Sequence, residues 1–210
     1  MLGRERRSKA LVLILSAAFF VCFSVYSVKA TEIDSWYIGD STRPVVSAVD
    51  VSSHQSGLTE TNYQNLKLLG VKTIIVKAME GSSYTNSYAL TQMKYAANAG
   101  LNVALYQYAK YTTATEAETE ANYLLTWLKE NNVNTDILIF SDIEAEASEV
   151  SSVWSNLSAF QSVLSSGGYT NQGFYASKSS TYLSRYLSSL VAVGRQLMVK
   201  STTFIKTVNY

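Results

Sequence analysis

Three residue types are scarce in this chain of 210 residues, which has one cysteine, one proline and one histidine. Cys22 lies within an apolar N-terminal run, so the rest of the chain has no thiol for a disulfide or a zinc site. His54 alone cannot supply a histidine-rich metal set, and it would have to be the base of any nucleophilic triad. We therefore expect neither a metal nor a cofactor.

The chain also lacks an excess of positive or of negative charge. The formal net charge is +1, and charged residues make up 16% of the chain. A nucleic-acid surface needs clustered basic side chains, so we expect no nucleic-acid partner. No glycine-rich phosphate loop is present, because Gly167 and Gly168 follow a predicted helix rather than a strand. Tyrosine, in contrast, is abundant at 15 residues, and its stacking ring and polar hydroxyl suit flat polar ligands such as sugars.

The N-terminal segment predicts export. Residues 1–30 combine a basic start, an apolar run over residues 10–28 and small residues at Val28 and Ala30, which is typical of a secretory signal peptide. The apolar run is also long enough to cross a bilayer, so an uncleaved anchor is the alternative and the only expected membrane contact. Residues 31–44 are predicted to form a linker. We expect a secreted, cell-wall-associated bacterial protein that is monomeric.

Strand and helix patterns alternate along the remainder of the chain. Strands are predicted at 45–51, 71–78, 101–108, 137–144 and 173–176. Helices are predicted at 61–69, 86–99, 115–131, 151–165 and 181–190. The third helix has a capping-box pattern at Thr115 and Glu118. Repeats of this size are βα units, so the sequence predicts an α/β fold with a parallel sheet.

Two carboxylates end the strand at 137–144. Asp142 and Glu144 are two positions apart, so in an extended strand their side chains project from the same face. Close carboxylates push their pKa values apart, which gives one acid and one base for the hydrolysis of a glycosidic bond. The alternative is a strand that leaves the core into a solvated acidic loop. A hard cation held by Asp142, Glu144 and Glu146 is disfavoured, because consecutive odd positions of one strand form a poor cage.

Further polar residues share this structural position. Parallel α/β folds place their sites at the carboxyl ends of the strands. The residues at or just beyond predicted strand ends are Asp50, Glu80, Gln107, Asp142, Glu144 and Tyr175. His54, three residues beyond the first strand, is a further candidate contact. Their convergence favours an active cleft.

Four segments resemble glycoside hydrolase family 25, the muramidases often called Chalaropsis-type lysozymes. Residues 49–55 (VDVSSHQ) resemble the opening signature of that family, and residues 70–81 (GVKTIIVKAMEG) resemble its second strand with an acid-glycine turn. Residues 99–108 (AGLNVALYQY) resemble its third strand. Residues 139–144 (IFSDIE) match the strand that carries the catalytic Asp-x-Glu pair. The catalytic domain is expected to span residues 45–190.

The resemblance implies an irregular TIM-like α/β barrel, here with five βα units. It also implies a lysozyme that hydrolyses the β-1,4 bond between N-acetylmuramic acid and N-acetylglucosamine, so that peptidoglycan is the expected partner and substrate. Carried over by motif, Glu144 is the acid/base, Asp142 is its partner and Asp50 lines the same pocket. The implied substrate-binding residues are His54, Glu80, Tyr106, Gln107, Tyr108 and Tyr175.

Two departures from the family pattern leave alternatives open. The family usually has histidine where this chain has Gln107, which keeps hydrogen bonding but cannot titrate. The closing C-terminal strands are expected to be missing or altered, because residues 191–210 form an atypical tail and no Asp or Glu follows Glu149. An unclosed barrel would leave exposed strand edges and an impaired cleft. The alternative function is a non-catalytic module that binds peptidoglycan.

Overall fold

Strands and helices alternate along the residues that the computed structural model describes, 46–177 and 197–200. The strands are β1 Ala48–Val51, β2 Thr73–Glu80, β3 Tyr84–Thr85, β4 Asn102–Tyr108, β5 Leu138–Ile143, β6 Gln172–Ser177 and β7 Leu197–Lys200. The helices are η1 Ser53–Gln55, α2 Glu60–Leu68, α3 Ala89–Asn98, α4 Ala114–Glu130, α5 Ala145–Ser148 and α6 Val153–Ser166. The fold is therefore α/β, as the alternating patterns predicted.

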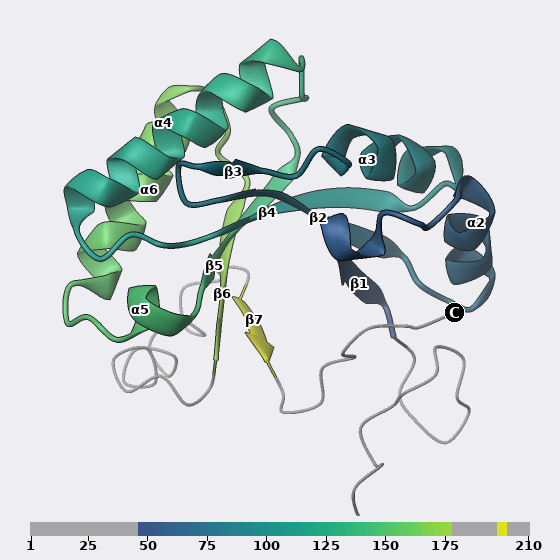
Figure 1. Ribbon diagram of the computed structural model, residues 1–210, viewed down its shortest axis with the longest axis horizontal. Helices are drawn as coiled ribbons and strands as arrows, with labels where there is room; N and C mark the ends of the chain where they lie inside the picture. The colour runs from purple at the N-terminus through teal and green to yellow at the C-terminus, as the bar shows by residue number, and fades with distance from the viewer. Residues whose placement is uncertain (1–45, 178–196, 201–210) are drawn as a thin grey trace, which may run out of the picture. The chain divides into compact units, whose positions relative to one another are not determined.

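The strands form one mostly parallel sheet with the order β1-β2-β4-β5-β6-β7. The short β3 is the exception, since it pairs antiparallel with β2 (Figure 1). β7 was not expected, because residues 191–210 were interpreted as an atypical tail. It pairs in parallel with β6, from Phe174 beside Leu197 to Ser177 beside Lys200. Within the described residues no pairing joins β7 to β1, so this part of the sheet has two edges.

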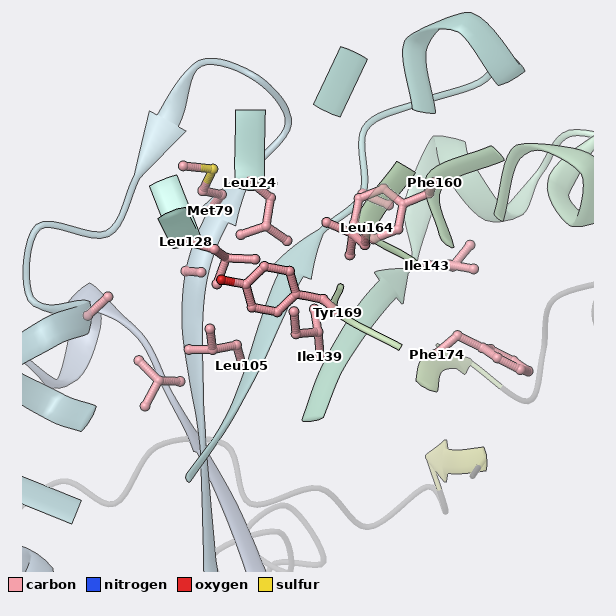
Figure 2. Close-up of a cluster of buried hydrophobic side chains, with 14 of the residues drawn as sticks. Met79, Leu105, Leu124, Leu128, Ile139, Ile143, Phe160, Leu164, Tyr169 and Phe174 are labelled. Atoms are coloured by element: carbon pink, nitrogen blue, oxygen red, sulfur yellow. The ribbon is translucent and has the colours of Figure 1, made fainter. Parts of the chain in front are cut away.

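One face of the sheet packs against the helices. α2 and α3 contact each other, α3 also lies against β2 and β4, and α4 packs beside α6 (Figure 1). The hydrophobic core fills the space between these layers, and ten of its side chains are labelled in Figure 2. Tyr111, completely buried, has its ring centroid 5.9 Å from that of Phe160 on α6. Burial of this apolar surface is the main stabilising contribution to the fold.

The α4 helix begins earlier than the capping-box pattern indicated. The N-cap is Thr113, whose side chain accepts a hydrogen bond from Glu116 N at 3.2 Å. The Glu116 carboxylate accepts in return from the backbone N–H of Thr113 at 3.1 Å and of Thr112 at 2.7 Å. Both Thr113/Glu116 and Thr115/Glu118 satisfy the sequence pattern of a capping box, and the prediction at Thr115 and Glu118 is wrong.

Other predicted segments lie outside the described residues. These are the signal peptide at 1–30, the linker at 31–44 and the helix at 181–190. In the part of the chain that is described, no helix has both the length and the hydrophobicity that a membrane span requires.

Candidate active site

A cavity of about 290 Å³ opens on the face of the sheet opposite the helices, near the carboxyl ends of its strands. It is lined by Asp50, Ser52, His54, Ile75, Lys77, Tyr106, Tyr108, Phe140, Asp142, Glu144 and Tyr175. The lining combines acids, one lysine, three tyrosines and apolar side chains. Such a mixture of apolar walls and a few convergent polar groups is typical of a ligand site.

Strand alternation explains why these residues share a cavity. In β1, β4 and β5 the even-numbered residues face the cavity, and the odd-numbered residues face the helices. The pairing register brings the polar residues at the carboxyl ends of β4, β5 and β6 side by side. Tyr108 lies beside Asp142, and Asp142 lies beside Tyr175. Neighbouring strands are about 4.8 Å apart, so these side chains are adjacent at the rim.

The floor of the cavity is apolar. Ile75, Ala104 and Phe140 are buried and form a small cluster separate from the main core. Tyr106 packs against this cluster with its partly buried ring. The floor gives the sheet a hydrophobic surface under the charged rim, where the ring of a sugar could rest.

Nearby carboxylates raise the pKa of two tyrosines that line the cavity. Burial raises the pKa of Tyr106, and the charges of Asp50 and Asp142 raise it further. Burial also raises the pKa of Tyr175, with additional contributions from Glu144, Asp142 and Asp50. Tyrosine has an ordinary pKa of about 10, so both residues are protonated at neutral pH and their hydroxyl groups can donate hydrogen bonds. Asp50, Asp142 and Glu144 thus share one electrostatic environment, although they come from two non-adjacent strands.

The backbone is strained directly after Glu144. Glu144 is the N-cap of α5 in an extended conformation, with φ −124° and ψ 178°. Ala145, the next residue, has φ +45°, a left-handed conformation that residues with a Cβ rarely adopt. Such outliers are concentrated at functional sites, where the surrounding structure maintains them. The turn fixes the direction in which the Glu144 side chain leaves the strand.

Among the residues that the structure describes, Lys77 is the one lysine or arginine that lines the cavity. Its Nζ lies 2.6 Å from Glu80 Oε2. The same Nζ lies 5.1 Å from the ring centroid of Tyr108 and 5.6 Å from that of Tyr84, which are cation–π distances. Hydrogen bonding and charge from Lys77 hold the pKa of Glu80 below its usual range. Glu80 is therefore an ionised partner that orients Lys77 and is not itself part of the cavity lining.

Gln107 does not face the cavity, which corrects its expected role in substrate binding. It is completely buried on the helix side of β4, where its Nε2 donates to Glu120 Oε2 of α4. Glu120 is also buried, and its desolvation raises the pKa of that carboxyl. The cause is alternation, because Tyr106 and Tyr108 occupy the cavity face and the residue between them points the other way.

Most of the predicted site residues lie together. The cavity contains Asp50, His54, Tyr106, Tyr108, Asp142, Glu144 and Tyr175, whereas Glu80 and Gln107 do not line it. The prediction missed Ser52, Ile75, Lys77 and Phe140. Counting two residues back from Asp142 would have found Phe140. On β2 the register shifts between Lys77 and Met79, so Ile75 and Lys77 are out of step with Glu80 at the strand end. Among the residues described, no three His, Cys, Asp or Glu side chains are grouped so that they could hold a metal ion.

The similarities of this chain to known proteins concern its family and its fold. A family model described as glycosyl hydrolases family 25 matches residues 49–194. Muramidase from Trichobolus zukalii has a similar structure, with a TM-score of 0.58 and 18% identity over 78% of this chain and 81% of that chain. A family 25 glycosyl hydrolase from Bacillus anthracis has a TM-score of 0.56 and 18% identity over 78% and 73%. No curated protein sequence matches the chain.

A third similar structure is that of a longer protein. The modular autolysin LytC from Streptococcus pneumoniae, solved in complex with a synthetic peptidoglycan ligand, has a TM-score of 0.55 and 19% identity. The match covers 63% of this chain and 32% of LytC, so the chain spans about a third of the length of that relative. At these identities the likeness to solved structures concerns the fold.

Proposed function

Because the chain belongs to glycosyl hydrolases family 25, we propose that it is a muramidase of bacterial peptidoglycan. The bond hydrolysed is the β-1,4 link between N-acetylmuramic acid and N-acetylglucosamine. The observation that carries the proposal is the gathering of Asp50, Asp142 and Glu144 with three tyrosines in one cavity at the strand ends. LytC, which has a similar fold, was solved with a peptidoglycan ligand, and this supports the choice of substrate.

In this proposal Glu144 is the general acid. It protonates the glycosidic oxygen as the bond to the anomeric carbon breaks, and it later accepts a proton from the water that completes hydrolysis. The carboxylates of Asp142 and Asp50 stabilise the positive charge that develops on the sugar ring. The strained turn at Ala145 keeps Glu144 directed at the cavity.

The tyrosines and the apolar floor bind and orient the sugar. Tyr106, Tyr108 and Tyr175 present hydroxyl groups beside the acids, and burial raises the pKa of each one. A protonated phenol can donate a hydrogen bond to a sugar oxygen, and its ring can stack on a sugar face. His54 lies on the 3-10 helix η1 at the edge of the cavity and is proposed to contact the substrate there.

The fold and location of the enzyme are part of the same proposal. The sheet forms the wall of an irregular TIM-like barrel, which is supported by its parallel strands, the alternating helices and a cavity at the carboxyl ends. Residues 1–30 direct export, and the catalytic domain occupies residues 45–190. The protein then acts outside the cell on the cell wall, where its substrate is found.

A non-catalytic peptidoglycan-binding module is the second candidate. The observation that favours it is the absence of Asp and Glu from residues 150–210, so every candidate acid comes from earlier strands. Such a module would bind peptidoglycan with the tyrosines and the apolar floor but would not hydrolyse it.

The two candidates are separated by measuring release of reducing sugar from purified peptidoglycan by the full chain. We expect turnover by the wild type and a loss of about 10²- to 10⁴-fold in Glu144→Gln, because the general acid is removed. Glu130→Gln, an exposed acid on α4, is the matched control and should match the wild type. Binding to peptidoglycan without turnover by the wild type would favour the binding module. Equal turnover by Glu144→Gln would contradict the assignment of the acid.

A further inference from the structure

A second group of charges lies beside the acids. It consists of Lys77, Glu80, Tyr108 and Lys110, which we call the lysine–tyrosine cluster. Lys77 Nζ and Lys110 Nζ lie 5.1 Å and 5.2 Å from the centroid of the Tyr108 ring. Glu80 contacts both ammonium groups, with Oε2 at 2.6 Å from Lys77 and Oε1 at 3.5 Å from Lys110. With two cations and one anion, the cluster carries a net positive charge.

Lys110 is held in place through its backbone and its stem. Its backbone N–H donates to the Glu120 carboxylate at 3.3 Å. The Cγ of Lys110 lies close to the backbone of Gly81. If residue 81 had a Cβ, this atom would lie 3.2 Å from Lys110 Cγ. Gly81 itself has φ +55° and donates its N–H to Tyr108 O at 3.0 Å. The side chain is therefore directed by the turn after β4 and the turn after β2 together.

The ammonium group of Lys110 remains able to bind a ligand. The side chain is 45% exposed, compared with 14% for Lys77. At 3.5 Å, its ion pair with Glu80 is longer than the 2.7–2.9 Å of a strong charge-assisted hydrogen bond. An exposed pair of this kind contributes little stability, so a ligand carboxylate can replace Glu80 at small cost. Lys77 then keeps the shorter bond to the other oxygen of Glu80.

Tyr108 joins the cluster to the acidic part of the cavity. After burial, the largest influence on its pKa is Asp142, which raises it, whereas Lys110 lowers it. In the sheet Tyr108 lies beside Asp142, and its ring centroid lies 5.2 Å from Lys110 Nζ, so Tyr108 is next to both groups. A sugar bound over the acids would carry its substituents across Tyr108 towards Lys110.

We propose that Lys110 is a specificity-determining residue that binds a carboxylate on the peptide substituent of the glycan. The proposal rests on the proposed function, since peptidoglycan carries such a substituent on its muramic acid residues. A neutral glycan offers no anion at this point. Lys110 therefore makes the enzyme prefer glycan strands whose peptides keep free carboxylates, and it contributes to binding rather than to bond cleavage.

The test compares Lys110→Met with the wild type on two substrates. One is peptidoglycan with native peptide carboxylates, and the other is the same material with these carboxylates converted to amides. Affinity is measured by co-sedimentation of the full chain with insoluble material, and kcat and KM are measured on solubilised strands. Lys129→Met, which removes an exposed lysine at the end of α4, is the matched control, and Lys110→Arg is the conservative variant.

We expect Lys110→Met to weaken binding and raise KM about fivefold on the native substrate, with little change in kcat. On the amidated substrate the variant and the wild type should be equal. Lys110→Arg and Lys129→Met should keep the native preference, and added salt should reduce it. Equal affinity of the wild type for the two materials, or equal losses by Lys110→Met on both, would overturn the proposal. If the wild type does not hydrolyse peptidoglycan but still binds the native material more tightly than the amidated material, the proposed hydrolase activity is rejected. The proposed contact between Lys110 and a peptide carboxylate would then still stand.

Discussion

The two faces of the sheet consist of alternate residues of the same strands, yet their compositions differ. On the helix face the buried side chains are almost all apolar, and the exceptions include the hydrogen-bonded pair of Gln107 and Glu120. On the cavity face of the described strands, the buried apolar cluster consists of Ile75, Ala104 and Phe140. Above them are three carboxylates and a lysine. One face is therefore built for packing, and the other concentrates charge.

This difference indicates that the helix face stabilises the fold and that the cavity face destabilises it. Apolar burial on the helix face stabilises the chain. Neighbouring carboxylates repel one another and are costly to desolvate, so the cavity face works against stability. Natural proteins keep such groups at sites that act on ligands. Variants on the two faces should therefore change different properties.

The largest effect on stability is expected from the helix face. Phe160 is 1% exposed and packs against Tyr111, so Phe160→Ala leaves a cavity in the core. We expect a loss of about 3–5 kcal/mol in the free energy of unfolding, measured with urea. Tyr123→Ala is the control, because Tyr123 is 54% exposed, and it should change stability by less than about 0.5 kcal/mol. Similar losses in the two variants would contradict the assignment of the core.

A smaller effect is expected at the buried polar pair of the helix face. Desolvation holds the pKa of Glu120 above its usual value, so the folded state binds this proton more tightly than the unfolded state. Stability should therefore fall as pH rises from the unfolded pKa, about 4.3, through the folded pKa. Glu120→Gln carries no such proton and should exceed the wild type at neutral pH by on the order of 1 kcal/mol, with no advantage at acidic pH.

The measurement is thermal unfolding from about pH 3.5 to about pH 7.5, which begins below the unfolded pKa of glutamate. Glu118→Gln, an exposed residue of the same helix, is the control and should follow the wild-type profile. A difference between Glu120→Gln and the wild type that does not change with pH would show that the carboxyl is not the cause.

The smallest effect is expected at the turn beside the cavity. Ala145 has φ +45°, and glycine adopts this conformation without strain, so Ala145→Gly should stabilise the fold by about 0.5 kcal/mol. The same change should lower turnover slightly, because the direction of Glu144 becomes less fixed. Ala147→Gly in α5 is the matched control, and it should destabilise by removing a buried methyl group. A loss of stability in Ala145→Gly would show that the turn is not strained.

The strands β1, β2, β4, β5 and β6 could be predicted from the sequence because their apolar runs are local signals. The spacing of Asp142 and Glu144 alone predicted that they share one face, which the structure identifies as the cavity face. Gln107 was misplaced because it was grouped with the strand end, whereas alternation assigns it to the helix face. Lys77 was missed because a single lysine in an apolar strand gives no sign of a site. Its place in the cavity follows from the register, which pairs it with Tyr106.

Features that depend on distant segments could not be predicted. β7 has four residues, and its place depends on pairing with β6, about 20 residues earlier in the chain. The left-handed turn at Ala145 has no sequence signal, since glycine or asparagine would be expected at such a position. The contacts of Lys110 require the turns after β2 and β4 to meet. In each case the cause is tertiary structure rather than local preference.

The central claim is that the carboxylates of the cavity face serve chemistry and not stability. Asp142→Asn tests it most directly, with peptidoglycan hydrolysis and thermal unfolding measured on the same full-length preparation. We predict that turnover falls by about 100-fold or more. The melting temperature should be equal to or above that of the wild type, because repulsion from Asp50 and Glu144 is relieved. A lower melting temperature with unchanged turnover would contradict the account and make Asp142 a structural residue.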